Sequence, residues 1–347
     1  MKVLVTYGRK PPYPPHGQHL AKAFRDLGHS AMLLPVRDQP WWETSRKRLG
    51  GFLTKHWQWD RIEWANKRLL RTAAGYRPDL IIETGGELFT PSALRTIKRR
   101  WGVRLGASLV EGPFRGDIPA VLAEYDRVVS TSQVAVEQLR HAGLPLVEYL
   151  PFATDPTWFH PRSQQSSAPL YSLAFVGAYA PRRARFLEFV SDLGLGIWGP
   201  DWDHRCPSVV LRTALRAARG VFGSSLVRCY QNSKIVLNIQ REHMTTLTRS
   251  GQEVGTGLGW RHFDVPACGS LLLTEHVLEL SEAFTVGEEV ETFSSPEELR
   301  EKTSYFLAHE TQREVMIRRA RERVLRDHTY LQRAQKWVEW FEQLPQH

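Results

Sequence analysis

Short apolar runs alternate with amphipathic segments along the first half of the chain. The runs predict buried strands at residues 2–6, 31–34, 80–83, 104–109, 127–130 and 147–150. Between the first two runs, Leu20, Phe24 and Leu27 recur at helical spacing until Gly28 ends the helix. Further helices are expected at residues 52–74, 92–101, 118–125 and 132–141. Strands that alternate with helices favour parallel pairing through right-handed crossovers, so this half is predicted to be a doubly wound, Rossmann-like α/β domain.

A polar stretch bounded by prolines, residues 161–169, interrupts this alternation and predicts a linker. The pattern then restarts, with strands expected at residues 172–176, 196–198, 235–239 and 271–274 and helices at 183–193 and 226–232. We therefore expect two Rossmann-like domains, residues 1–162 and residues 170–325, with a cleft between the carboxyl ends of their two sheets.

The end of the chain is almost wholly helical in its pattern, from residue 297 to residue 344. An apolar stripe near its end comprises Leu331, Ala334, Trp337 and Phe341. We expect residues 326–347 to form a helix that crosses back onto the first domain.

Composition narrows the class of protein. A chain of 347 residues exceeds what one core usually holds, and 42% apolar content excludes general disorder. No run of eighteen apolar residues occurs, and the apolar run at the N-terminus is too short for a secretory signal, so we expect a cytoplasmic protein. The three cysteines have no ligand-like spacing and predict neither a disulfide framework nor a zinc site.

The net charge of +9 is concentrated in one region. Residues 41–104 hold fourteen Lys and Arg against six Asp and Glu, together with six of the twelve tryptophans. In the helix expected at residues 52–74, Trp57 and Trp64 lie beside arginines, on a different face from the apolar stripe. This face either packs on a neighbouring element or makes a peripheral contact with the inner membrane surface. A nucleic acid, a charged glycan or only solvent would also fit the basic surface.

The residues around the strand expected at 235–239 suit phosphate binding. That strand leads through a polar loop to three alternate glycines, Gly255, Gly257 and Gly259, and then to a short helix. Backbone N–H groups converge in such a loop and favour an anion, although the glycines alone would also suit a simple surface turn. Cations follow the predicted strand ends or open a strand, namely Arg182, Arg183, Lys234, Arg241 and Arg261. They can stabilise a departing diphosphate without a metal ion.

Several motifs in the second half carry a family resemblance: LAFVGAY (173–179), IWGPDW (197–202), YQNSKIVLNIQRE (230–242), WRHFDVPACGSLLLTE (260–275) and RARERVLRDHTYLQRAQ (319–335). In these motifs the chain resembles the CgeB-like spore-maturation glycosyltransferases, within the wider group that has the two-Rossmann GT-B fold. The resemblance implies transfer of a sugar from a UDP-, GDP- or dTDP-sugar, held by the second domain, to an acceptor hydroxyl bound mainly by the first. It leaves open whether the acceptor is a glycan, lipid, protein or nucleic acid.

The resemblance also implies roles for single residues. Asp264 stands where related enzymes usually carry a glutamate that accepts hydrogen bonds from the nucleotide ribose. Thr256 stands where the broader retaining group has an acidic residue in contact with the donor sugar. Together with the motif positions, this predicts a donor site built from Gly177, Arg182, Arg183, Trp198, Gly199, Lys234, Arg241, Gly257, Arg261 and Asp264.

The stereochemical outcome decides whether the enzyme needs a base. An inverting reaction requires one to deprotonate the acceptor, and the candidates near strand ends of the first domain are Glu111, His16 and Glu83. A retaining reaction by a front-face route needs none, and the resemblance favours retention. Asp201 and Asp203 match a D-x-D metal motif, but they lie in a turn of a family motif, and we expect a metal-independent enzyme without a cofactor.

Two other classes of function stay open. A chain that kept the nucleotide-sugar fold but lost turnover would be a binding protein, which the residue at position 256 makes conceivable. The basic region at residues 41–104 would also fit a protein that binds nucleic acid or glycosylates a modified base.

Overall fold

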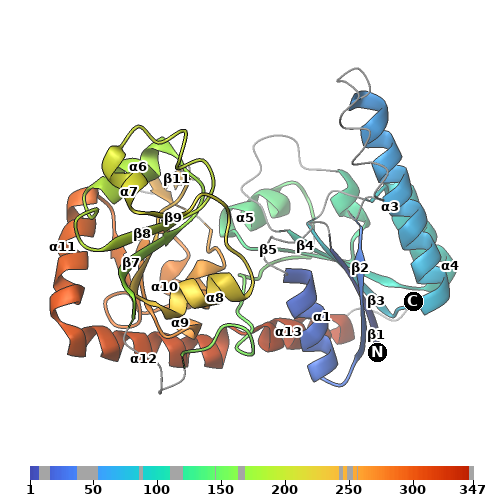
Figure 1. The fold of residues 1–347 in the computed structure, drawn as a ribbon. Helices are drawn as coiled ribbons and strands as arrows, with labels where there is room; N and C mark the ends of the chain where they lie inside the picture. Colours follow the sequence, from blue (N-terminus) through green and yellow to red (C-terminus); the bar gives the residue numbers. More distant parts are fainter. Residues whose placement is uncertain are drawn as a thin grey trace. The chain divides into compact units, whose positions relative to one another are not determined.

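The computed structural model describes residues 1–7, 16–36, 54–85, 89–109, 120–144, 146–162, 169–241, 245–247, 253–255 and 257–343. These residues form two compact units (Figure 1). Unit 1 comprises Met1–Leu150 and Tyr330–His347, and unit 2 comprises Pro151–Thr329. Each unit has its own parallel sheet of six strands.

The sheet of unit 1 has the order β2-β1-β3-β4-β5-β6, and every neighbouring pair is parallel. Its strands are β1 (Lys2–Tyr7), β2 (Ser30–Pro35), β3 (Leu80–Thr84), β4 (Arg104–Leu109), β5 (Arg127–Ser130) and β6 (Val147–Tyr149). The helices of this unit are α1 (His16–Asp26), α3 (Thr54–Tyr76), α4 (Pro91–Trp101), η2 (Ala120–Glu124), α5 (Gln133–His141) and α13 (Tyr330–Gln343). The helix expected at 118–125 is thus a short 3-10 helix over its described part.

Helices cover both faces of this sheet, which explains why its central strands β3 and β4 are buried along their whole length. On one face, Leu105 and Ala107 of β4 join the core formed with α3, α4 and α5. Successive side chains of a strand point to opposite faces, so Gly106 between them faces the other helical layer. A Cβ atom at Gly106 would lie 2.5 Å from the Trp337 ring of α13, so the glycine is what lets this helix approach the strand.

The sheet of unit 2 has the order β14-β13-β10-β7-β8-β9 and is also parallel. Its strands are β7 (Tyr171–Val176), β8 (Leu195–Trp198), β9 (Leu215–Ala217), β10 (Ser233–Asn238), β13 (Leu271–Glu275) and β14 (Glu291–Phe293). Its helices are α6 (Pro181–Glu188), α7 (Val209–Thr213), α8 (Ser224–Gln231), α9 (Arg261–Ala267), α10 (Leu280–Ala283), α11 (Pro296–Ala308) and α12 (Glu310–Asp327). A separate hairpin pairs β11 (Thr245–Leu247) with β12 (Glu253–Gly255).

The direction of winding reverses beside β7. The chain adds β8 and β9 on one side of this strand and then places β10, β13 and β14 on the other. In open parallel sheets, ligands bind outside the carboxyl ends of the strands at such a switch point. The ends of β7 and β10 are therefore where a ligand of unit 2 is expected.

The units divide about ten residues before the proline-bounded stretch at 161–169. The reason is that residues 151–160 already pack in unit 2. The Phe152 ring stacks on Trp260 with centroids 4.1 Å apart, and the Gln231 side-chain amide donates to the His160 carbonyl at 2.6 Å. Thr154 N–H donates to the His328 carbonyl at 2.9 Å. His328 directly precedes Thr329, the last residue of unit 2, after which the chain returns to unit 1.

The basic, tryptophan-rich helix expected at 52–74 is α3. Trp64 is partly buried against the core of unit 1, and the Arg68 guanidinium lies 5.0 Å from its ring centroid. The Trp57 side chain lies outside the described residues. None of the described helices combines the length and the apolar character that crossing a bilayer requires.

Candidate functional site

Two glycines shape the loops that follow β7 and β8. A Cβ atom at Gly199 would lie 1.9 Å from the Gly177 carbonyl oxygen, so only glycine fits there. The same carbonyl oxygen accepts a hydrogen bond from Trp202 Nε1 at 2.8 Å, and Gly177 N–H donates to the Trp198 carbonyl at 2.8 Å. The two loops are thereby locked together beside the switch point.

Arg182, near the start of α6, is held by the carboxylate of Glu275. Its two terminal nitrogens each contact one carboxylate oxygen, the Nη1–Oε2 distance being 2.9 Å. Glu275 Oε2 also accepts from the Gln240 N–H at 2.5 Å, which joins the ends of β13 and β10. Glu275 is not among the donor-site residues predicted from the sequence, although an acidic residue directly at the end of an apolar strand marked the position.

Arg183 is a buried cation that braces the same strand ends. Its Nε donates to the Ile239 carbonyl at 3.0 Å and its Nη1 to the Ala178 carbonyl at 2.9 Å. Burial lowers the pKa of Arg183 to about 9, and the nearby charges of Arg261 and Arg241 add to this effect. The guanidinium still carries its charge at neutral pH and adds to the positive potential of the site.

Arg261, the first residue of α9, spans the switch point. Its Nη1 donates to Asn238 Oδ1 at 3.2 Å, at the end of β10, and its Nη2 donates to the Val176 carbonyl at 2.6 Å, at the end of β7. Arg241 follows β10 and has an exposed side chain. The fold thus gathers four arginines at the carboxyl edge of the sheet, and among them Glu275 is the carboxylate in a direct ion pair.

Asp264 lies one helical turn after Arg261 and is only 4% exposed. Burial raises the pKa of this carboxyl well above its usual value; contact with Thr154 and the charge of Arg261 oppose the rise, and Asp155 adds to it. A carboxyl in this setting has a strong need for hydrogen-bond donors, because its ionised form is poorly solvated.

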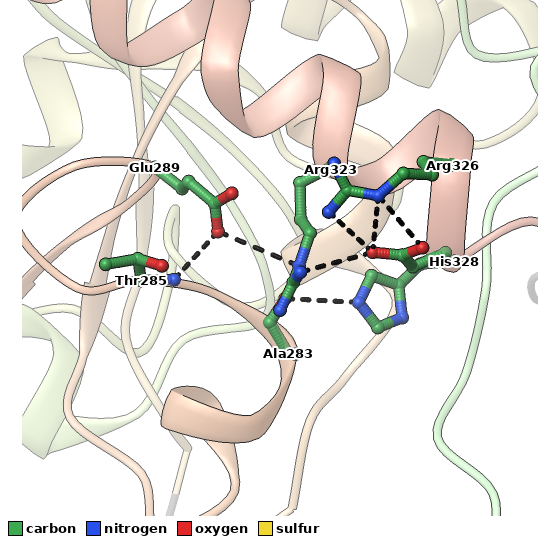
Figure 2. Close-up of polar contacts among 7 residues, drawn as sticks. Ala283, Thr285, Glu289, Arg323, Arg326 and His328 are labelled. Atoms are coloured by element: carbon green, nitrogen blue, oxygen red, sulfur yellow. Dashed lines mark hydrogen bonds and ion pairs between the residues drawn. The ribbon is translucent and has the colours of Figure 1, made fainter.

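α9 is braced from behind by the segment after β13 and by the end of α12. The Ala283 carbonyl accepts from Arg323 Nε at 2.9 Å and pairs with His328 Nε2 at 3.1 Å (Figure 2). Asp327 Oδ2 lies 3.2 Å from Arg323 Nη1, and the His328 ring lies 5.0 Å from Phe263 of α9. The end of α12 therefore packs against the helix that carries Arg261 and Asp264.

The remaining donor-site candidates lie apart from the arginines or pack elsewhere. Lys234 is at the amino end of β10, about 13 Å along the strand from Asn238. The Trp198 ring is 8% exposed and packs edge-on against Tyr171, so it is a packed aromatic. Gly257 has φ 90° and donates its N–H to Glu279 Oε2 at 2.7 Å. Thr256 lies outside the described residues.

Two of the candidate bases of unit 1, His16 and Glu83, lie at the carboxyl edge of its sheet. His16 begins α1, with Nδ1 3.1 Å from the Tyr330 hydroxyl and Nε2 3.4 Å from Ser108 Oγ. Burial, followed by the charges of His19 and Arg333, lowers the pKa of His16 to about 3, so the imidazole is neutral at physiological pH. Glu83 in β3 is 2% exposed, and Glu111 lies outside the described residues.

The D-x-D sequence makes local ion pairs. Asp203 Oδ1 lies 2.6 Å from His204 Nδ1, and Asp201 lies within 3.7 Å of both His204 and Arg205. Within the described part of the chain, no group of three or more His, Cys, Asp and Glu residues has the arrangement of a metal site.

Comparison with known proteins finds similarity to glycosyltransferases. Residues 182–339 match the model of a family described as glycosyl transferase-like. That match covers the arginine site, and it confirms the predicted class of enzyme, a glycosyltransferase. A comparison with curated proteins gives no match.

Solved structures establish the fold. The chain is similar to a sucrose-phosphate synthase from Thermosynechococcus elongatus, with a TM-score of 0.71 and 12% identity over 99% of this chain and 98% of that one. It is also similar to Anabaena Alr3699/HepE in complex with UDP and glucose, with a TM-score of 0.68 and 12% identity over 99% and 100% of the two chains. A third similar structure is a glycosyltransferase from Rickettsia africae ESF-5, with a TM-score of 0.63 and 13% identity over 98% of this chain and 97% of that one. The predicted GT-B fold class is confirmed.

Proposed function

We propose that this chain is a metal-independent, retaining glycosyltransferase of the CgeB-like type that uses a uridine diphosphate sugar as its donor. The observation that carries the proposal is the arginine cluster at the switch point of unit 2, with Asp264 one turn away. Loss of the sugar leaves a diphosphate whose negative charge must be stabilised, and fixed guanidinium groups do this without reorganisation. The UDP bound in the structure of Alr3699/HepE supports uridine as the base.

The four arginines have two different roles in this proposal. Arg241 is exposed and Arg261 borders the loops after β7 and β10, so these two would contact the diphosphate. Arg182 and Arg183 are more buried than Arg241; they hold the strand ends together and add positive charge to the site. The positive charge gathered by the four side chains takes the role that a divalent ion has in metal-dependent transferases.

Asp264 would accept hydrogen bonds from the ribose hydroxyls. Burial raises the pKa of Asp264, so two hydroxyl donors would stabilise the ionised carboxylate that burial disfavours. Aspartate reaches less far than glutamate, which requires the ribose to lie close to α9. In a retaining front-face reaction, the leaving phosphate oxygen takes the proton of the acceptor hydroxyl, and no base from unit 1 is needed.

The first experiment is calorimetric titration with UDP, GDP and dTDP, followed by a UDP-release assay with UDP-sugars and candidate acceptors. Asp264→Ala should weaken UDP binding about tenfold to a hundredfold, since hydrogen bonds to a charged group contribute about 1.5–3 kcal/mol. The matched control is Asp203→Ala, an exposed carboxylate on the loop after β8. UDP affinity that is equal in wild type and the Asp264 variant would exclude the ribose role. Tight UDP binding without release from any UDP-sugar would identify a binding protein instead.

A further inference from the structure

Behind Arg261 lies a buried polar triangle formed by three elements. Asn238 ends β10, His262 belongs to α9 and Thr274 belongs to β13; they are 7%, 2% and 0% exposed. Asn238 Nδ2 lies 3.0 Å from Thr274 Oγ1 and 3.1 Å from His262 Nε2, and His262 Nε2 lies 3.1 Å from Thr274 Oγ1. A buried triangle of this kind is stable only if each donor meets an acceptor.

The hydrogen-bond directions in the triangle follow from one carbonyl group. His262 Nδ1 lies 3.1 Å from the Gly259 carbonyl, which can only accept, so Nδ1 carries the proton. Burial lowers the pKa of His262 to about 4, so the ring is neutral and Nε2 is an acceptor. The group of Asn238 that faces Nε2 must then be its NH₂, which places the amide oxygen on the opposite side.

That oxygen is the atom that receives Arg261. Arg261 Nη1 donates to Asn238 Oδ1 at 3.2 Å, while Nη2 is held by the Val176 carbonyl. If the amide were rotated by half a turn, its NH₂ would face the guanidinium and its oxygen would face the lone pair of His262. Both contacts would be repulsive, so the imidazole tautomer fixes the orientation of the amide.

We propose that His262 and Asn238 are positioning residues for phosphate recognition: the Nδ1-protonated imidazole orients the Asn238 amide, and the amide aims the Arg261 guanidinium at the donor diphosphate. This inference rests on the proposed function, and it names the residues that make Arg261 competent. With one terminal nitrogen held at the end of β10 and the other at the end of β7, the planar guanidinium has a fixed orientation. A guanidinium group that already has a fixed orientation loses less conformational entropy on binding two phosphate oxygens than a mobile one does.

The test uses two amide replacements of the same histidine. In His262→Gln, the side-chain oxygen can reach the position of Nε2 and still accept from Asn238. In His262→Asn, the shorter amide can reach only the Gly259 carbonyl, and the acceptor for Asn238 is lost. Each variant removes one of the histidine's two kinds of contact, so both should lower the melting temperature to a similar degree.

Their affinities for a diphosphate should differ. We expect His262→Gln to bind UDP within about threefold of wild type and His262→Asn to bind it about tenfold to a hundredfold more weakly. Binding of uridine, which has no phosphate, should be equal in the two variants. In an Arg261→Gln background, His262→Asn should have no further effect on UDP affinity. Equal UDP affinities in the Gln and Asn variants, or full additivity with Arg261→Gln, would overturn the inference.

Failures of the two proposals can be separated. A wild-type protein that binds neither UDP nor pyrophosphate overturns the proposed function and this inference together. If wild type binds UDP and the predicted difference between variants is missing, only the inference falls. A measurement on the wild-type protein covers the case in which a variant does not fold: imidazole ¹⁵N spectra should assign the proton of His262 to Nδ1, and a proton on Nε2 would contradict the mechanism.

Discussion

At the scale of single residues, the arginines of unit 2 differ in role although they look alike in the sequence. Arg183 donates to two backbone carbonyls, Arg182 is paired with Glu275, and Arg261 bridges two strand ends. Arg241 remains exposed. Burial lowers the pKa of Arg183, and the charges of Arg261 and Arg241 lower it further, so these cations repel one another. A bound anion would reduce this repulsion and stabilise the folded protein.

Arg241→Gln tests this electrostatic balance. Because the side chain is exposed and its charge disfavours the protonated form of Arg183, its removal should leave the melting temperature without ligand unchanged or raise it. The further rise on adding pyrophosphate should be smaller than in wild type, because the variant lacks the proposed phosphate contact of Arg241. Differential scanning fluorimetry at constant ionic strength measures both values, with Arg228→Gln, an exposed arginine on α8, as the control. A lower melting temperature without ligand and an undiminished response to pyrophosphate would contradict the assignment.

The lowered pKa of His262 predicts that the protein becomes less stable to unfolding in acid. Its pKa is about 4 in the folded protein against an ordinary value of 6.5, so between these values the unfolded chain binds a proton that the folded chain does not. The free energy of unfolding should fall as the pH decreases through this window, by about 3 kcal/mol in total. Urea denaturation at pH 7, 5.5 and 4.5 should show a steeper decrease for wild type than for His262→Gln, which has no titrating ring. Parallel decreases in the two proteins would mean that His262 is not held neutral.

At the scale of elements, the contact between β4 and α13 depends on one missing side chain. Gly106 lets the Trp337 ring reach the strand, and α13 buries Tyr330 and Trp340 on the same unit. Helix and strand lie more than 200 residues apart in the sequence, so their fit depends on the whole of unit 1 being formed.

Gly106→Ala should therefore destabilise unit 1. The new methyl group would overlap the Trp337 ring, and overpacking of this kind costs about 1–3 kcal/mol. Combining it with Trp337→Leu should give a smaller total loss than the sum of the single losses, because the smaller side chain makes room for the methyl group. The matched control is Gly75→Ala in α3, where a Cβ would meet nothing within 4 Å and should be neutral or stabilising. Chemical denaturation measures the four variants, and additive losses at positions 106 and 337 would argue against the contact.

At the scale of the whole molecule, the end of the chain belongs to the unit that begins it. α12 packs in unit 2, and the next helix, α13, packs in unit 1. Tyr330 is the first residue of α13, and its hydroxyl lies 3.1 Å from His16 Nδ1 in α1. Unit 1 is therefore incomplete until the last residues of the chain are in place.

Deletion of residues 330–347 should destabilise unit 1 and leave unit 2 folded. Unit 1 would lose buried Tyr330, Trp337 and Trp340, each of which contributes about 2 kcal/mol or more by burial, and should unfold or become sensitive to protease. Unit 2 contains the complete arginine cluster and should still bind UDP. Limited proteolysis with mass spectrometry, together with UDP titration, tests both statements. A protease-resistant unit 1 in the truncated chain would show that α13 is dispensable.

The sequence by itself determined the class of fold and most of its long elements. Apolar runs and helical periodicity are local signals, so they located β1, β3, β4, β7, β10, β13 and the main helices. They also located the three-residue strand β6, but they did not reveal β9, β14 or the β11–β12 hairpin, because strands of three residues offer too few positions for a dependable period. Nothing in the local sequence around Gly106 indicated that it would contact the Trp337 ring.

The sequence likewise named Arg182, Arg183, Arg241, Arg261 and Asp264, because strand ends and motif positions are readable along the chain. Only the tertiary structure decided their partners: the carboxylate of Glu275, the carbonyls of Ile239 and Val176, and the amide of Asn238. It also separated Lys234 from the cluster and packed Trp198 against Tyr171. The physical reason is that hydrogen bonding and burial arise between segments distant in sequence, whereas periodicity is a property of one segment alone.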